Sequence, residues 1–493
     1  MRQPAVRRLK ALALALVGFS TLLTAASNGW LDNGCDHRRA AVRPSVSPSP
    51  PPPAPPPLQQ PTTVPLSRIA IGVCSSAATL CSRAEMLREW WDPQLVGDVY
   101  VDELPEGRGN ASCALPPGLR LRVSQPHPSW TDEKLMVTML NKKVHVRASA
   151  RCSRIAQELG AMHRPDADWY VLADDDAMFS PPNLARLLGR YPSSQPWYLG
   201  SWSESSVKVK YFGRMAFGGG GIVLSAALMH ELRGGALDAC LLQLRGKAKY
   251  WLDERMWHCV QPLGVPLTRA EGMHQLDVAG DVLGLLEAHP QSPFVSLHHL
   301  QQLAPLPLRR AVLFEAMRAD PARFLQQSRC AVDRRGGRRG SGADKIVVAG
   351  GFSVRWWAAQ HTGHAALSAV ALGQVQQTFD VDMRIDSGSH ANTATPFTLE
   401  LAAAKAPPCR RFLFSRVEAG HTEGEVALIY TAGHTAAADG LPPTLRTVSI
   451  YQRPWPAGQA RDESRSCCRA LSVGADVATL EVVDTGERCF AKE

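Results

Sequence analysis

A short apolar segment followed by three aspartates constrains the possible fold of this chain more than any other feature. Trp169 to Ala173 has the length and composition of a buried strand, and Asp174, Asp175 and Asp176 follow it directly. Buried strands of this kind occur in parallel sheets covered on both faces. The carboxyl ends of such strands are where α/β sheets bind ligands. The sequence therefore predicts three mutually repelling carboxylates at a ligand-binding edge.

A divalent cation would neutralise this acidic cluster. Carboxylate oxygens suit Mg²⁺ or Mn²⁺, which also share their coordination with substrate phosphates. The alternative is a solvated acidic turn that caps the next helix. The buried strand before the triplet and Phe179 after it favour the metal interpretation. Asp380 and Asp382 have a similar spacing, but no apolar strand leads into them, so we interpret them as an exposed strand face.

Strand and helix patterns alternate around this motif. Strands are expected at 68–73, 98–101 and 169–173, and helices at 80–91, 148–160 and 183–190. This alternation predicts a largely parallel, doubly wound α/β sheet. Residues 346–493 are richer in β-branched residues and turns, with strand candidates at 411–416, 426–430 and 448–451. They are expected to form a smaller β-rich region after a Gly/Arg-rich boundary.

The first 67 residues predict entry into the secretory pathway. Four basic residues within 1–10 precede an apolar run over 11–31, which is marginally long enough to span ~30 Å of hydrocarbon. We expect an uncleaved anchor, and the alternative is a signal peptide cleaved near Ala26. Eleven of the 22 residues from Pro44 to Pro65 are proline, which predicts an extended stem.

The cysteines agree with an oxidising compartment. All twelve lie after the apolar run, and none has the C-x-x-C spacing of a structural zinc site. Their pairing cannot be read from the sequence, although Cys240 with Cys259 and Cys74 with Cys81 are plausible short loops. The sequon at Asn110 is consistent with luminal exposure.

The net charge of +9 does not indicate a nucleic-acid partner. Residues 1–43 carry seven basic and two acidic side chains, and Asp333–Lys345 carry five and two. The rest of the chain is close to neutral. A nucleic-acid-binding domain needs its positive charge spread over a folded face, so this class of function is excluded.

A glycine run follows the acidic triplet in the sequence. Four consecutive glycines, Gly218–Gly221, are entropically costly, so the backbone there is expected to adopt positive φ or to approach a ligand closely. Gly219 and Gly220 are the contact positions that we expect. The alternative is a flexible hairpin.

Two further motifs could complete a site. Asp253 and Glu254 could supply a base for an acceptor hydroxyl, or they could be helix-terminal acids that interact with the helix dipole. His298 and His299 end an apolar stretch, where neutral imidazole could complete a metal site begun by carboxylates. We favour His299 over His298, and the alternative is a hydrogen-bonded structural histidine.

The order of these motifs resembles glycosyltransferase family 31, in its Fringe-like branch. The resemblance runs from Arg68 to about Cys330, and a weaker similarity continues after Cys330. It is carried by the following stretches: Ile71–Val73 with Trp90-Trp91, Trp169–Asp176, Tyr198–Ser201 with Ser203–Ser205, Gly218–Gly221, Gly264–Thr268, Gly272–Gln275, His289-Pro290, Ser296–Leu300 and Asp320–Cys330.

The resemblance implies a GT-A type fold, a UDP-sugar donor, Mn²⁺, Golgi residence and inverting transfer that forms a β-1,3 linkage. It also implies that Asp176 binds the metal and that a downstream histidine, here His299, completes the site. We add Asp174 as a metal ligand and expect Asp174 and Asp175, with Gly219 and Gly220, at the nucleotide sugar.

The acceptor-side acidic pair departs from the family pattern. Its second member is usually aspartate, whereas this chain reads Asp253-Glu254. We favour Glu254 as the base, with Asp253 next. Displacement of the catalytic base by ~1 Å can greatly lower the rate of the transfer reaction. This departure motivates the alternative of a catalytically silent carbohydrate-binding protein with the same fold.

Together these features predict a single-pass type II protein of the Golgi membrane, anchored by one N-terminal helix. It would transfer a GlcNAc- or galactose-type sugar to a glycan or glycoprotein acceptor. The expected parts are a cytosolic tail (1–10), a transmembrane segment (11–31), a proline-rich stem (32–67), a GT-A type Rossmann-like domain (68–330), a basic loop (331–345) and a β-rich region (346–493).

Overall fold

The computed structural model describes residues 63–106, 109, 111–125, 136–139, 142–162, 166–204, 208–209, 212–244, 252–276, 292–300, 310–332, 343–361, 409–432, 441–454 and 465–483. All of them belong to one compact unit, Pro57–Glu493. The predicted tail, anchor and most of the stem lie outside these ranges, as do Asn110, Asp380–Asp382 and the basic stretch 334–342. No helix within the described ranges is both long enough and apolar enough to cross a bilayer.

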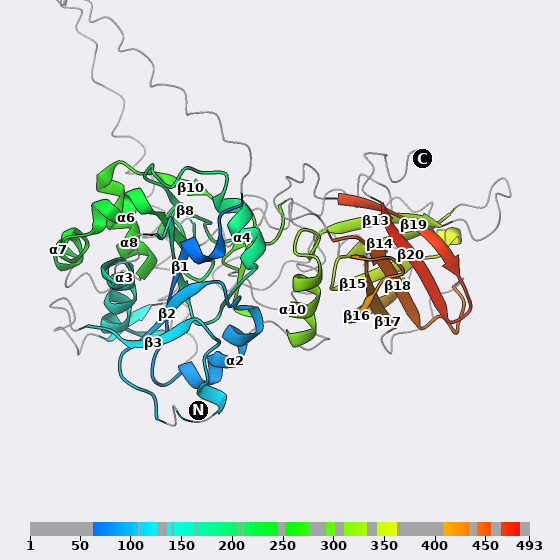
Figure 1. Cartoon of the computed structure of the whole chain (residues 1–493), viewed down its shortest axis with the longest axis horizontal. Coiled ribbons are helices and arrows are strands. Elements are labelled where there is room, and N and C mark those ends of the chain that lie inside the picture. Colours follow the sequence, from blue (N-terminus) through cyan, green and yellow to red (C-terminus); the bar gives the residue numbers. More distant parts are fainter. Residues whose placement is uncertain are drawn as a thin grey trace, which may run out of the picture. The chain divides into compact units, whose positions relative to one another are not determined.

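A seven-stranded sheet forms the first half of this unit (Figure 1). Its strand order is β10-β8-β9-β6-β1-β2-β3, and only β9 runs against the others. The bounds are β1 Ile69–Cys74, β2 Val96–Val101, β3 Leu119–Val123, β6 Trp169–Asp174, β8 Tyr198–Gly200, β9 Ile222–Ser225 and β10 Leu267–Arg269. The largely parallel α/β sheet predicted from the sequence is confirmed.

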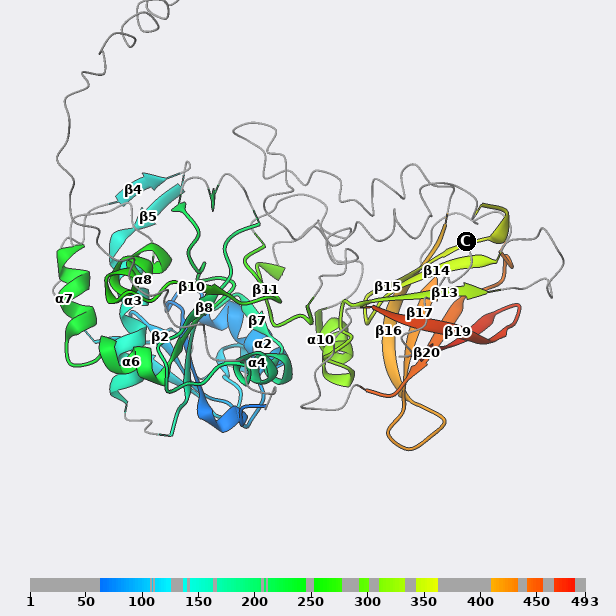
Figure 2. The same cartoon turned by 90° about the horizontal axis from the view of Figure 1, so that it is seen from above.

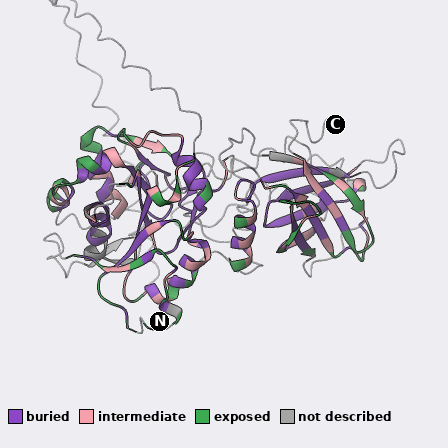
Figure 3. Ribbon diagram, viewed as in Figure 1, coloured by how far each residue is buried: buried purple, intermediate pink, exposed green. Residues whose placement is uncertain are grey.

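Helices cover both faces of this sheet, which explains why β1 and β6 are apolar without alternation. Ile69, Ile71 and Val73 pack with α2 and α4 in one core cluster, whereas Ala70 packs with α3, α6, α7 and α8 in another. Figure 3 shows the central strands as buried. The helix bounds are α2 Leu80–Trp90, α3 Val146–Ala161, α4 Pro181–Leu188, α6 Ala226–Leu232, α7 Ala236–Gln243 and α8 Leu252–Val260.

A small three-stranded sheet, β11-β12-β7, continues from the end of β6. Its strands are β7 Ala177–Phe179, β11 Met273–His274 and β12 Ser296–His298. β12 runs antiparallel to β7, with His298 opposite Ala177. The short elements elsewhere in this half are β4 Met136–Met139, β5 Lys142–His145, η1 Leu66–Arg68, η2 Ala111–Cys113 and η4 Gln261–Leu263.

The C-terminal β-rich region is a closed barrel of eight strands (Figures 1 and 2). The strands are β13 Gln327–Val332, β14 Asp344–Ala349, β15 Ser353–Trp357, β16 Arg410–Ala419, β17 Val426–Ala432, β18 Thr447–Gln452, β19 Arg465–Val473 and β20 Val477–Val483, with η6 Ala359–His361 between β15 and β16. α10, Arg310–Ala319, precedes β13 and contacts β16. The three strands predicted here from the sequence are confirmed.

The barrel begins earlier than the predicted boundary at residue 346. β13 pairs with both β14 and β19, so residues assigned to the preceding domain and to the basic loop are barrel strands. The residues Gln327–Val332 show no regular apolar–polar alternation, so the strand is defined by its pairing with β14 and β19.

Four disulfides are present in the described residues: Cys74–Cys152, Cys81–Cys113, Cys240–Cys259 and Cys330–Cys468. The Cys240–Cys259 pair predicted from the sequence is confirmed. The Cys74–Cys81 pair is wrong, because Cys74 ends β1 on the face covered by α3, which carries Cys152. Cys81 lies instead in the first turn of α2, beside η2.

Candidate functional site

The acidic triplet and the histidine pair meet because β7 and β12 are paired strands. Asp174 ends β6, Asp175 and Asp176 form the turn that follows, and β7 begins at Ala177. Since His298 lies opposite Ala177, its ring is brought to the residue just before β7. The site therefore combines the carboxyl end of β6 in the large sheet with the end of β12, which lies over 120 residues further along the sequence.

His298 is held between a backbone carbonyl and a carboxylate. Its Nδ1 lies 3.2 Å from the carbonyl oxygen of Gln275, and its Nε2 lies 2.9 Å from Oδ1 of Asp176. A carbonyl oxygen only accepts, so the Nδ1 atom carries a hydrogen, and the protonated ring donates a second hydrogen from Nε2 to the carboxylate of Asp176. This arrangement fixes the ring and directs Nε2 at the carboxylate, as is usual for metal-binding histidines.

His299 completes a compact donor set. Its ring stacks on that of His298 with centroids 3.4 Å apart, and its Nε2 lies 3.6 Å from Oδ2 of Asp176. Ligand atoms of Asp176, His298 and His299 all lie within 4.8 Å of one another. One carboxylate and two imidazoles form a donor set suited to Mn²⁺, Fe²⁺ or Zn²⁺. These residues therefore fit a divalent ion.

The backbone of His299 is in the left-handed region, with φ of 57°. This conformation is uncommon for residues other than glycine, although histidine adopts it more often than most. Such strain persists where the surrounding structure fixes it, often at functional sites. Here it turns the second imidazole back toward Asp176.

The three aspartates have different environments. Burial raises the pKa of Asp174, the charge of His298 partly offsets this, and with the neighbouring carboxylates the pKa reaches about 7. Burial would also raise the pKa of Asp176, but the hydrogen bond and charge of His298, with His299 and Arg83, lower it to about 2. Asp174 Oδ2 lies 3.8 Å from His298 Nε2, so it borders the donor set.

Asp175 faces the loop after β1. Its Oδ2 accepts hydrogen bonds from Ser75 Oγ at 2.6 Å and Thr79 Oγ1 at 2.9 Å. Arg83 of α2 approaches both Asp175 and Asp176, at 3.7 Å and 3.4 Å. Asp175 thus fixes the turn to the first strand, and this is how Asp176 is presented to the histidines.

The glycine run packs against the histidine pair. A Cβ on Gly219 would lie 2.1 Å from Nδ1 of His298, and Gly221 has φ of 99°. The N–H of Gly220 donates to Gln275 Oε1 at 2.8 Å, and its carbonyl accepts from Ser296 Oγ. The expected positive φ is present, and the close approach is to the protein itself. Contact of Gly219 and Gly220 with a ligand stays a prediction.

Asp253 and Glu254 lie in the first turn of α8. Asp253 Oδ2 accepts a hydrogen bond from the N–H of Gly218 at 3.4 Å, and its charge contributes to the raised pKa of Asp174. Burial lowers the pKa of the neighbouring Arg255, and the charge of Glu254 partly offsets this effect. The structure brings Asp253 to the edge of the acidic cluster, and the choice of Glu254 as the base stays a prediction.

Sequence reasoning ranked His298 below His299 and missed Arg83 and Gln275. The register of β12 against β7 places His298 opposite Ala177, and this register cannot be read from the motif. Arg83 is one of two arginines in α2, and nothing in the sequence distinguishes it from Arg88. The motif Gly272–Gln275 was noted, but the contact of Gln275 with the glycine run depends on the fold.

The fold and the site define an α/β protein with a carboxylate–imidazole cluster at the edge of its sheet. The family described as "Protein of unknown function, DUF604" matches residues 208–468, which is more than half of the chain. The chain belongs to this family. The matched residues include the glycine run, the histidine pair and most of the barrel, so the barrel is part of what defines the family.

The chain is also related to a Fringe glycosyltransferase of Drosophila melanogaster. The two are 29% identical over 163 residues, which cover 29% of this chain and 39% of that protein. The chain therefore matches well under half the length of this curated relative. The Fringe-like relationship predicted from the sequence motifs is confirmed.

Three solved structures with detectable likeness are far from this chain in sequence. They include the galactosyltransferase LgtC with donor and acceptor sugar analogues (TM-score 0.27, 13% identity, covering 40% of this chain and 73% of that one) and mouse xyloside xylosyltransferase 1 (0.27, 10%, 41% and 85%). A third is a mannosyltransferase from Pyrobaculum calidifontis with GDP-Man and Mn²⁺ (0.25, 12%, 54% and 66%). TM-scores this low do not establish a shared fold, so the fold is assigned from the sheet topology.

Proposed function

We propose that this chain is a divalent-metal-dependent hexosyltransferase that uses a UDP-sugar as its donor. The observation that carries the proposal is the cluster of Asp176, His298 and His299 at the carboxyl edge of the α/β sheet. The relationship to a Fringe glycosyltransferase supports the reaction class. Mn²⁺ is the ion that we propose, because it accepts both oxygen and imidazole ligands.

Asp176, His298 and His299 would hold the ion, with Asp174 at the border of the donor set. A divalent ion bound there supplies charge stabilisation to the diphosphate that leaves the sugar. Asp175 and Arg83 orient Asp176 from the side of β1. Gln275 keeps the hydrogen of His298 on Nδ1, so that Nε2 remains directed at the site.

Asp253 is the base that we propose first, and Glu254 second. Asp253 is hydrogen-bonded to the glycine run and lies close enough to Asp174 to influence its pKa. From there a carboxylate would take the proton of an acceptor hydroxyl as its oxygen attacks the anomeric carbon. Attack opposite to the departing UDP inverts the anomeric configuration, which gives a β linkage. The attacking group that we propose is a 3-hydroxyl of the acceptor, so that a GlcNAc- or galactose-type sugar is joined in β-1,3 linkage.

The proposal also covers the acceptor of the sugar and the cellular location of the protein. The acceptor is a glycan or glycoprotein hydroxyl, and the protein resides in the Golgi as a single-pass type II membrane protein. The support for the location is the apolar segment at 11–31 together with the disulfides, which form in oxidising compartments.

The test is a panel of UDP-sugars with the purified chain, assayed for hydrolysis and transfer with Mn²⁺ and with EDTA. We expect turnover of one donor that depends on the metal. Turnover that persists unchanged in EDTA would refute the metal assignment. Binding of a donor without any turnover would favour a catalytically silent carbohydrate-binding protein, which the Asp253-Glu254 departure motivates.

A further inference from the structure

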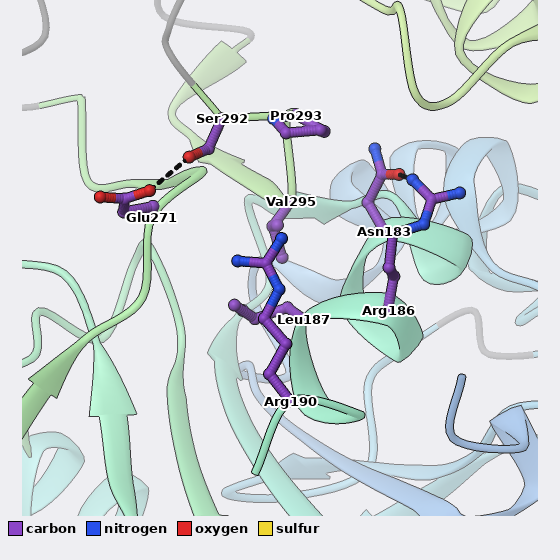
Figure 4. A pocket seen from close by; sticks show the side chains of 8 residues that line it. All are labelled: Asn183, Arg186, Leu187, Arg190, Glu271, Ser292, Pro293 and Val295. Atoms are coloured by element: carbon purple, nitrogen blue, oxygen red, sulfur yellow. Dashed lines mark hydrogen bonds between the residues drawn. The ribbon is translucent and has the colours of Figure 1, made fainter. Parts of the chain in front are cut away.

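A pocket lies beside α4, and none of the three aspartates belongs to its lining (Figure 4). It lies between α4 and the segment that leads into β12, and its empty space of about 260 Å³ is partly open to solvent. Its lining combines two arginines with one acid and few other polar groups: Asn183, Arg186, Leu187, Arg190, Glu271, Ser292, Pro293 and Val295.

Arg186 is a buried cation without an acidic partner. Its exposed fraction is 6%, and its Nη1 donates to the amide oxygen of Asn183 at 3.0 Å. Its Nε is buried and has no hydrogen-bond partner. Within the described ranges no carboxylate forms an ion pair with this guanidinium. Burial lowers the pKa of Arg186, which reflects the cost of keeping the charge there.

Arg190 brings a second positive charge to the same pocket. It follows Arg186 by four residues, just beyond the end of α4, and Figure 4 shows both side chains extending from the helix in the same direction. The charge of Arg190 further lowers the pKa of Arg186. Two like charges around one small pocket repel each other unless an anion lies between them.

The acids nearest to this pair have other partners. Glu271 accepts a hydrogen bond from Ser292 Oγ at 2.6 Å. Asp320 contributes some attraction to Arg186, but its Oδ2 accepts from Arg323 at 2.5 Å and from Gln452 at 3.0 Å. Neither carboxylate reaches the unpaired Nε of Arg186.

We propose that this pocket binds a small oxyanion, a carboxylate or a phosphate, between Arg186 and Arg190. A buried, unpaired guanidinium is strongly destabilising, whereas the fork of an arginine matches an oxyanion well. The bound anion joins α4 to the residues 292–295 that lead into β12. It therefore supports the strand that carries His298, and the site does not depend on the proposed transferase activity.

The test is thermal unfolding of the purified full chain, followed by tryptophan fluorescence at fixed ionic strength. A salt of a bulky sulfonate is replaced stepwise by sodium phosphate in one arm and by sodium acetate in the other. We expect a saturable rise in Tm of at least about 2 °C in one arm or both. A rise with phosphate alone identifies a tetrahedral oxyanion, and a rise with acetate identifies a carboxylate.

The variants Arg186→Gln and Arg190→Gln assign the effect to the pocket. Arg186→Gln should abolish the rise, and Arg190→Gln should shift its midpoint to about tenfold higher anion concentration. Arg469→Gln is the matched control, because it removes the same charge from an exposed position of the barrel. If Arg186→Gln does not fold, the shift in midpoint for Arg190→Gln alone shows whether the rise in Tm comes from the pocket. A rise that is absent in the wild type, or equal in the pocket variants and the control, overturns the proposal.

Discussion

The Nε2 atom of His298 lies 2.9 Å from Oδ1 of Asp176, although 122 positions separate the two residues in the sequence. The contact depends on the antiparallel register in which His298 faces Ala177. A second contact, from Nδ1 to the carbonyl of Gln275, sets the tautomer. The donor set is thus built by strand pairing before any ion binds.

Replacing Asp176 by asparagine tests this donor set with almost no change in shape. The substitution removes the negative charge shared by His298, His299 and Arg83. We expect Mn²⁺-dependent turnover of the UDP-sugar to fall at least about 100-fold, more than is typical for residues that only support ligands. Steady-state hydrolysis kinetics over a range of Mn²⁺ concentrations measure the effect.

Glu85→Gln is the control for this experiment, because Glu85 is exposed and lies on α2 away from the triplet. It should retain full activity. Wild-type turnover by Asp176→Asn would show that this carboxylate does not hold the ion.

Gly219 and Gly218 form a matched pair for the packing of the glycine run. A Cβ on Gly219 would overlap the imidazole of His298 at 2.1 Å, whereas one on Gly218 would meet only the flexible side chain of Leu252 at 3.2 Å. We expect Gly219→Ala to displace His298 and to weaken Mn²⁺ binding at least about tenfold. The added bulk should also lower stability by about 1–3 kcal/mol.

Calorimetric titration with Mn²⁺ and thermal unfolding of both variants check this prediction. Gly218→Ala should stay close to the wild type in both measurements. Equal Mn²⁺ affinity in the two variants would mean that the glycine run does not set the position of His298.

The acidic motif could be predicted from the sequence because it follows from local pattern. An apolar run of strand length before Asp174 indicates a buried strand, and the carboxyl end of that strand locates the ligand edge. The glycine run likewise indicates a close approach. It does not say what approaches, and the structure provides the ring of His298.

The approach of both His298 and His299 to Asp176 could not be predicted, since it depends on the register of β12 and on the left-handed backbone of His299. The pairing of Cys74 failed for a similar reason. Its partner, Cys152, is distant in sequence and is placed by the packing of α3 on β1. The barrel closes through the parallel pairs β13·β19 and β18·β20, which no local pattern reveals.

The disulfide Cys240–Cys259 links α7 to α8, which carries Asp253, across a sequence separation of 19. Replacing both cysteines by alanine should lower the free energy of unfolding by about 3 kcal/mol, because the unfolded chain gains loop entropy. It should also reduce kcat, since α8 is held less firmly. Chemical denaturation and donor turnover measure the two effects.

The Cys330–Cys468 pair in the barrel provides the comparison. Removing it should destabilise the barrel without changing kcat at temperatures where the chain remains folded. A kcat that falls equally in both double variants would mean that the loss is not specific to α8.

The variants Asp253→Asn and Glu254→Gln separate the two candidate bases. Asp253 contacts the glycine run through the N–H of Gly218, so its loss should lower kcat about 10²–10⁴-fold, the range of a general base, with little change in donor KM. Glu254→Gln should lower kcat less than tenfold, as expected of a carboxylate that is not the base. Single-turnover transfer to an acceptor distinguishes loss of the base from loss of binding. The reverse ranking would restore Glu254 as the base, and a wild type that binds the donor without transfer would favour the silent carbohydrate-binding alternative.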